Sequence, residues 1–168
     1  MRSFSPNLPQ GTRDFLITTF LTSAPFEREP GFRFFLSYQV FESLIQELFS
    51  KLIQKFMANT NGLSSTDIKD LIDDLSRSLQ ERTRLNEVIA SCPGIQEEVK
   101  NLEIACNTLL QLSGSAVQDS APKALYAVRN LLFHRYAQAT SLRVELERVA
   151  DSLFSLGCEL AIQYVPPA

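Results

Sequence analysis

A chain of 168 residues with a hydrophobic fraction of 45% and a charged fraction of 21% has the balance of a globular protein, which excludes a chain that is disordered throughout. At this length a single domain can bury a sizeable core. The formal net charge of -3 excludes a broad basic surface that coats nucleic acid, so any such contact must be local, and no DNA partner is expected.

The cysteines and the apolar runs indicate the cellular compartment of the protein. Cys92, Cys106 and Cys158 are widely spaced and contain no Cys-x-x-Cys pair, so we predict neither a disulfide framework nor a zinc site. No other metal and no cofactor is expected. No stretch reaches the roughly 20 apolar residues of a membrane span, and Thr18 and Thr19 interrupt the one run that resembles a signal peptide. We therefore expect a cytoplasmic protein with no membrane partner.

The first element is a lead-in, residues 1–30, which is rich in proline and glycine. Proline fixes φ and removes a backbone donor, so we predict an irregular segment. Apolar residues such as Phe15 and Phe20 are too frequent here for a free tail. We therefore expect a short strand or helical turn that packs on a helical domain formed by residues 31–168.

Helical periodicity dominates from residue 32 onwards. Over residues 32–56, apolar residues recur at alternating spacings of three and four, which predicts one long helix that ends at the turn-forming residues 59–62. A second helix is predicted over residues 64–92, where Ser64 caps the first turn and Asp67 is its partner.

Three further helices are predicted from stop signals and apolar stripes. The third begins at Ile95 and is broken at Gly114, and the fourth has Pro122 in its first turn. The last spans residues 142–160 and ends before the prolines at 166–167. Because the connections are short, sequential neighbours should run antiparallel. The sequence thus predicts an all-α, up-and-down helical bundle of about five helices after an irregular N-terminal lead-in.

The fourth predicted helix carries the residues most suited to chemistry. Its end holds the sole histidine of the chain, His134, together with Arg129, Asn130 and Tyr136. An imidazole can take or give a proton near neutral pH. A guanidinium can hold two phosphate oxygens while it stays charged, and an asparagine amide can orient either partner. These residue types suit the cleavage of a phosphodiester.

Helix geometry divides these residues between two faces. On an ideal helix Asn130 and His134 share a face, whereas Arg129 and His134 lie about 140° apart. One chain therefore does not obviously assemble the pair, but a two-fold homodimer could bring Arg129 of one copy to His134 of the other. Tyr136 stands seven residues after Arg129 and would border the same cleft if the helix extended that far.

The pattern Arg-Asn-x-x-x-His-x-Tyr at 129–136, late in an all-helical domain, resembles the signature of the HEPN superfamily. The similarity covers residues 32–164 loosely. It implies a metal-independent endoribonuclease that acts as a homodimer and uses the RNA 2′-hydroxyl as internal nucleophile. His134 would act in proton transfer, Arg129 would hold the scissile phosphate, and Asn130 would position the site.

The additional Tyr136 resembles the toxin branch of that superfamily, which is encoded beside a minimal nucleotidyltransferase. The resemblance implies that this antitoxin partner silences the toxin by nucleotidylating the tyrosine. The lead-in and the long second and third helices depart from the compact family pattern. Local charge agrees with an RNA site, because residues 123–148 carry five basic and two acidic side chains, against five and nine over residues 67–103.

Two other readings of the chain stay open. One is a non-catalytic HEPN-like helical module that binds a nucleotide, RNA or a protein partner, and the other is a dimerising scaffold. On spacing alone, His134 and Arg129 also fit a partly exposed histidine and a helix-surface arginine without a functional role. The acidic residues at 67–74 are expected to form a solvated helix face rather than a metal site.

Overall fold

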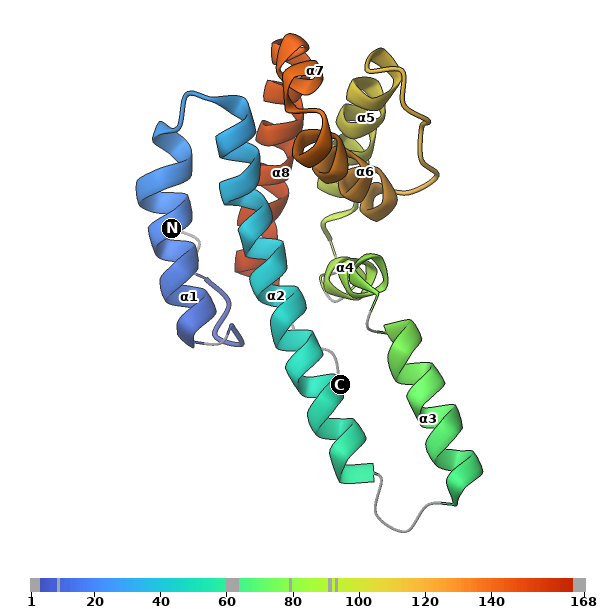
Figure 1. Cartoon of the computed structure of the whole chain (residues 1–168). Helices are drawn as coiled ribbons and strands as arrows, with labels where there is room; N and C mark the ends of the chain where they lie inside the picture. The colour runs from blue at the N-terminus through green and yellow to red at the C-terminus, as the bar shows by residue number, and fades with distance from the viewer. Residues whose placement is uncertain are drawn as a thin grey trace.

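The structure is a computed structural model that describes residues 4–8, 10–59, 64–78, 80–90, 92 and 94–164. Every regular element in this part of the chain is a helix, which confirms the predicted all-α class (Figure 1). None of these helices is long and apolar enough to cross a membrane.

The described residues form eight α-helices, with a π-helical segment, η1, and a 3-10 turn, η2, between the first two. In chain order the elements are α1 (Gln10–Leu16), η1 (Ile17–Ser23), η2 (Ala24–Phe26), α2 (Pro30–Asn59), α3 (Ser65–Ser78), α4 (Glu81–Ala90), α5 (Gln96–Leu112), α6 (Ala121–His134), α7 (Tyr136–Ser141) and α8 (Arg143–Gln163).

Residues 10–26 of the lead-in are helical, which corrects the irregular segment predicted for residues 1–30 and agrees with the expected helical turn. Four of the buried side chains in this helical part recur every four residues, so successive turns present one face to the core; they are Thr12, Leu16, Phe20 and Ala24. The prolines do not interrupt these turns. Pro25 lies in the first turn of η2 and Pro30 is the first residue of α2, positions where a missing amide hydrogen breaks no helical hydrogen bond.

The lead-in packs against the last helix, α8. The Phe20 ring meets the edge of Phe154 at a centroid distance of 4.9 Å. The Ser5 amide donates to the Ala161 carbonyl at 2.9 Å, and the Ser5 hydroxyl donates to the Tyr164 carbonyl at 2.7 Å. One continuous core therefore includes residues of the lead-in and of the helices that follow.

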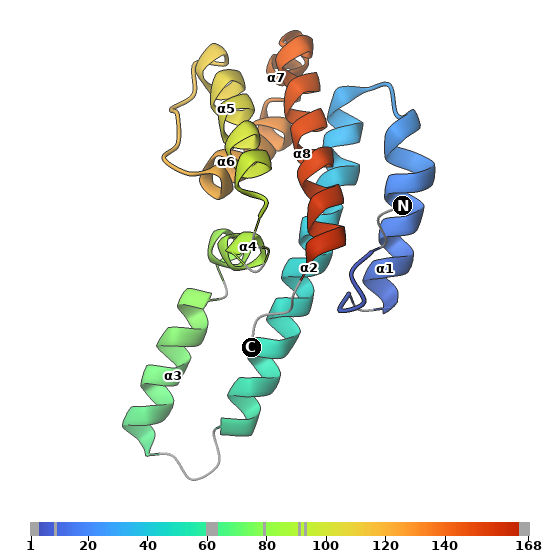
Figure 2. The ribbon, with the colours of Figure 1, turned by 180° about the vertical axis from the view of Figure 1, so that it is seen from behind.

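The helices α2 and α8 lie side by side through the middle of the molecule and run in the same direction (Figures 1 and 2). Arg33, near the start of α2, forms an ion pair with Asp151 of α8 at 2.6 Å. The buried face of α2 is the predicted aromatic stripe, with Phe34, Tyr38 and Phe41 each at most 2% exposed. This pair positions the shorter helices that surround it.

The second predicted helix is in fact two helices, α3 and α4. The predicted cap is confirmed, because the Asp67 amide donates to the Ser64 hydroxyl at 3.3 Å and the Ser64 amide donates to the Asp67 carboxylate at 3.2 Å. The Gln80 carbonyl then begins a new helix by accepting two amide hydrogen bonds. Residue 79 of the predicted stripe lies outside the described residues.

Packing explains the change of direction between α3 and α4. Leu85 and Val88 of α4 are fully buried in the core, whereas Ile72 of α3 is 50% exposed. In both views α4 is seen end-on, while α3 and the second half of α2 extend beyond the other helices (Figures 1 and 2). As a result α3 and α5 run in the same direction, and the predicted alternation of sequential neighbours does not hold along this stretch.

Candidate functional site

The helix α6 is held by an apolar face that fixes its rotation. Ser120 precedes it in an extended conformation, and Pro122 lies in its first turn as predicted. Leu125, Val128 and Leu132 are buried at spacings of three and four. Because this face points into the core, the motif residues lie along the two edges of α6.

Asn130 and His134 lie on one edge and line the same groove, as their spacing predicts. The groove has a volume of about 370 Å³. Its opposite wall is the connection between α5 and α6, which contributes Ser115 and Gln118. His134 is exposed and Asn130 half-buried, so both side chains are accessible to a ligand in the groove.

The wall opposite His134 is fixed by hydrogen bonds from two helices. Asn107 of α5 donates to the Gln118 carbonyl at 3.0 Å, and the Gln118 amide donates back to the Asn107 side chain at 2.8 Å. Gln138 of α7 donates to the Ser113 carbonyl at 2.6 Å. A connection that would otherwise be a free loop therefore forms a defined wall of the groove.

Arg129 lies on the other edge of α6 and is not among the residues that line the groove. Its guanidinium lies 4.4 Å from the centroid of the Phe133 ring, and its Nη1 donates to the Asn130 side-chain oxygen at 3.3 Å. Phe133 in turn meets Phe35 of α2 edge-on. Asn130 thus connects the two edges of α6. Its side-chain oxygen accepts the hydrogen bond from Arg129, and the residue also lines the groove that contains His134.

Tyr136 lies outside the groove, because α6 ends at His134. Arg135 leaves the helical conformation, with φ -140° and ψ 46°, and Tyr136 begins α7. The condition for Tyr136 to border the cleft, a helix that extends to residue 136, is therefore not met. Its ring instead lies over Gly31, where a Cβ atom would come within 3.1 Å of the phenol oxygen. A side chain at position 31 would therefore require the Glu29 or Tyr136 side chain to shift.

The phenol of Tyr136 lies beside the Glu29 carboxylate. Burial, followed by the charge of Glu29 and a hydrogen bond to it, raises the pKa of Tyr136 above its ordinary value. Tyr136 is therefore a neutral hydroxyl at physiological pH, although 41% of the residue is exposed. The Glu29 carboxylate also accepts the Phe32 amide at 2.8 Å, so it caps α2.

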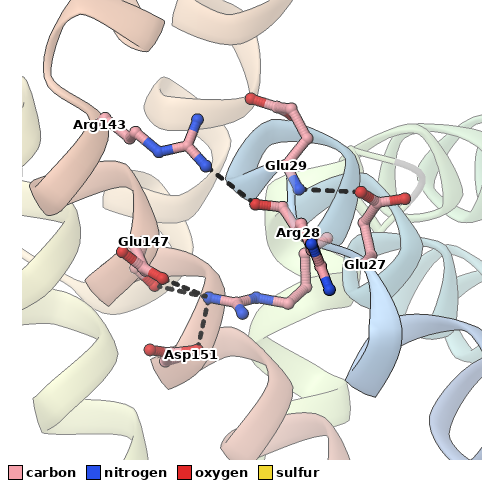
Figure 3. Close-up of polar contacts among 7 residues, drawn as sticks. Glu27, Arg28, Glu29, Arg143, Glu147 and Asp151 are labelled. Carbon is pink, nitrogen blue, oxygen red and sulfur yellow. Dashed lines mark hydrogen bonds and ion pairs between the residues drawn. The ribbon is translucent and has the colours of Figure 1, made fainter.

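The turn that carries Glu29 is tied to α8 (Figure 3). Arg143 donates to the Arg28 carbonyl at 3.0 Å, and the Glu29 amide donates to the Glu27 carboxylate at 2.8 Å. One turn later on α2, Arg33 pairs with α8. These contacts fix the start of α2, and with it the surface against which Tyr136 packs.

Three features of this region were not predicted from the sequence. Phe133 could have been found, because it stands four residues after Arg129 and must share its helix edge. The wall formed by Gln118 and the pairing of Glu29 with Tyr136 join segments far apart in the chain, and no local pattern indicates them.

Comparisons with known proteins add no relative. No protein-family model matches the sequence, and neither the curated proteins nor the solved structures give a match. Among the described residues, no three His, Cys, Asp or Glu side chains gather into a group that could hold a metal ion. The candidate site consists of Arg129, Asn130 and His134; Tyr136 lies outside the groove, over the start of α2.

Proposed function

We propose that this chain is a metal-independent endoribonuclease of HEPN type that acts as a symmetric homodimer, as a toxin or a defence effector. The observation that carries the proposal is the arrangement around Asn130. This residue shares a groove with His134 and also holds the guanidinium of Arg129. The all-helical fold and the placement of the motif at the end of α6 agree with the resemblance from which the proposal started.

RNA carries the nucleophile for the proposed reaction. The 2′-hydroxyl loses its proton to a base and attacks the adjacent phosphorus, and the 5′-oxygen of the next nucleotide leaves and takes up a proton. The products are a 2′,3′-cyclic phosphate and a 5′-hydroxyl. His134 would carry out proton transfer. Arg129 would bind the phosphate oxygens, whose negative charge grows in the transition state.

The homodimer follows from the two edges of α6. In one chain Arg129 and His134 face different surroundings, so a single copy presents half of the machinery on each edge. A two-fold axis near the end of α6 would place Arg129 of one copy at the groove of its partner, and the reverse contact would form the second site.

Tyr136 has a regulatory role in the same proposal, as the residue that a nucleotidyltransferase antitoxin modifies. Its exposure of 41% and its place two residues beyond the end of α6 support access from outside. A nucleotide attached there would add negative charge beside Glu29 and close to the proposed RNA surface. Both effects oppose RNA binding.

The proposal is tested by incubating the purified protein with RNA in the presence of EDTA. Wild type should cleave, and His134→Ala should lower the rate by about 100-fold to 10,000-fold, which is the usual contribution of a general acid or base. Gln111→Ala, which removes an exposed side chain at the end of α5, serves as the control and should keep the full rate. An equal rate of RNA cleavage by wild type and His134→Ala, or no cleavage by either, contradicts the proposal.

One observation favours a second candidate, a non-catalytic helical module that binds RNA, a nucleotide or a protein. Arg129 and His134 lie on different edges of α6, as they would in a protein that uses each for a separate contact. This candidate predicts RNA binding that depends on Arg129, without any cleavage by a preparation that is fully dimeric.

A further inference from the structure

An aromatic surface adjoins Arg129 on the edge of α6 that faces α2. Phe133 is 57% exposed, and its ring meets Phe35 at a centroid distance of 5.1 Å. Phe32, one turn before Phe35 on α2, is 61% exposed. We call Phe32, Phe35 and Phe133 the aromatic patch. Large apolar side chains that gather on an accessible surface mark a binding site more often than single exposed ones do.

Arg129 gives this patch its charge. Its guanidinium lies 4.4 Å from the centroid of the Phe133 ring, with Asn130 as the hydrogen-bond partner of Nη1. Among the described residues Arg129 has no ion pair, so no carboxylate neutralises its charge; its Nε is buried and has no hydrogen-bond partner. The charge is therefore free to bind an anion. Rings stacked beside a free guanidinium are the combination on which proteins bind unpaired nucleotides, because the rings stack on bases and the cation binds phosphate.

We infer that the aromatic patch is a stacking platform for an unpaired base of the RNA, next to the phosphate that Arg129 holds. The inference rests on the proposed function and adds the substrate class to it. A base inside a duplex is stacked on its neighbours and cannot reach an external ring, so the substrate is a single strand or a loop. One ring beside the cation, with the Phe35 ring against it, matches roughly one base. A few phenylalanine rings offer less surface than the roughly 800 Å² that each side of a stable protein interface buries, which favours a base over a protein partner.

The test measures binding separately from cleavage. The probe is a fluorescent single-stranded 2′-O-methyl RNA, which lacks the attacking hydroxyl, and the protein is the full chain. Phe133→Leu should raise the Kd by about 5-fold to 150-fold, the equivalent of about 1–3 kcal/mol for one stacked base. Phe133→Tyr keeps an aromatic ring and should restore binding. Phe26→Leu removes a ring that is 76% exposed in η2, outside the patch, and should leave the Kd unchanged.

An oligonucleotide with abasic positions distinguishes stacking from charge. It should bind to wild type and to Phe133→Leu with the same Kd, because it has no base to stack. The inference is overturned if Phe133→Leu binds the intact probe as wild type does, if the abasic probe shows the same loss, or if wild type does not bind at all. A change in oligomeric state on Phe133→Leu, measured by light scattering, also overturns it and makes the patch a contact between copies.

Cleavage of unmodified RNA is read in parallel, so that the two proposals fail separately. If wild type cleaves RNA and Phe133→Leu binds the probe as wild type does, the stacking platform is refuted and the ribonuclease proposal stands. Binding that depends on stacking, in a protein that does not cleave, removes the ribonuclease and leaves the platform.

Discussion

Arg129 combines an unneutralised charge with a fixed position. A flexible surface arginine loses side-chain entropy when it binds an anion. Here the Phe133 ring and the Asn130 oxygen already hold the guanidinium, so part of that cost is met in the free protein. Asn130 is thus a positioning residue in the proposed mechanism, since it acts on phosphate through Arg129.

Tyr164 presents a different polar group, a buried hydroxyl with no hydrogen-bond partner among the described residues. The residue is 1% exposed, and burial together with the nearby Glu47 carboxylate raises the pKa of Tyr164 to about 12. The fold therefore favours the neutral phenol. The stability that this gives is complete below pH 10, the ordinary pKa, and is lost as the pH rises from 10 to about 12.

Tyr164→Phe is expected to remove an unpaired hydroxyl without leaving a cavity. At pH 7 the free energy of unfolding should stay the same or rise by up to about 1 kcal/mol, because the buried hydroxyl costs desolvation without gaining a hydrogen bond. Between pH 10 and 12 the variant should lose less stability than wild type. Denaturant unfolding at both pH values measures this. A large loss at pH 7 would mean that the hydroxyl has a partner in solution.

At the scale of elements, local patterns predicted the long helices well. The extents of α2, α5 and α8 follow from apolar periodicity, while Gly114 follows the end of α5 and Pro122 lies in the first turn of α6, as predicted. The helical part of the lead-in was missed because its prolines were taken as breakers, although Pro25 and Pro30 stand at the starts of helical turns. The break between α3 and α4 follows from burial of Leu85 and Val88, which depends on distant partners.

Docking of the lead-in can be tested at Gly157 of α8. A Cβ atom at this position would come within 2.6 Å of the buried Phe20 ring. Gly157→Ala should therefore lower the free energy of unfolding by about 1–3 kcal/mol, through overpacking between η1 and α8. Gly11→Ala is the matched control, because a Cβ atom in α1 there meets nothing within 4 Å and should be neutral or slightly stabilising. If the two variants are equally stable, the Phe20 ring does not pack tightly against Gly157, which contradicts the docking of the lead-in on α8.

At the scale of the molecule, the sequence predicted the parts of the site that one helix determines. The shared edge of Asn130 and His134 follows from a spacing of four residues. The groove itself needs Gln118 from the α5–α6 connection, and the setting of Tyr136 needs Glu29 and Gly31 from the start of α2. Those neighbours come from the tertiary arrangement of the helices, which periodicity does not encode.

The proposed dimer explains why one chain holds Arg129 and His134 on separate edges of α6. A composite site of this kind predicts that two inactive variants complement each other in a mixed dimer, because each site takes one residue from each copy. In a mixed dimer of Arg129→Ala with His134→Ala, one site lacks both residues and the other has both. A site built within one chain would be inactive in both halves of the same dimer.

Mixing the two inactive variants therefore tests the account most directly. Arg129→Ala and His134→Ala are co-expressed, or refolded together, and RNA cleavage is measured in EDTA against each variant alone. Random pairing makes half of the dimers mixed, each with one intact site of two, so the mixture should recover about a quarter of the wild-type activity. An active wild type whose mixed variants stay as inactive as each variant alone would contradict the shared site.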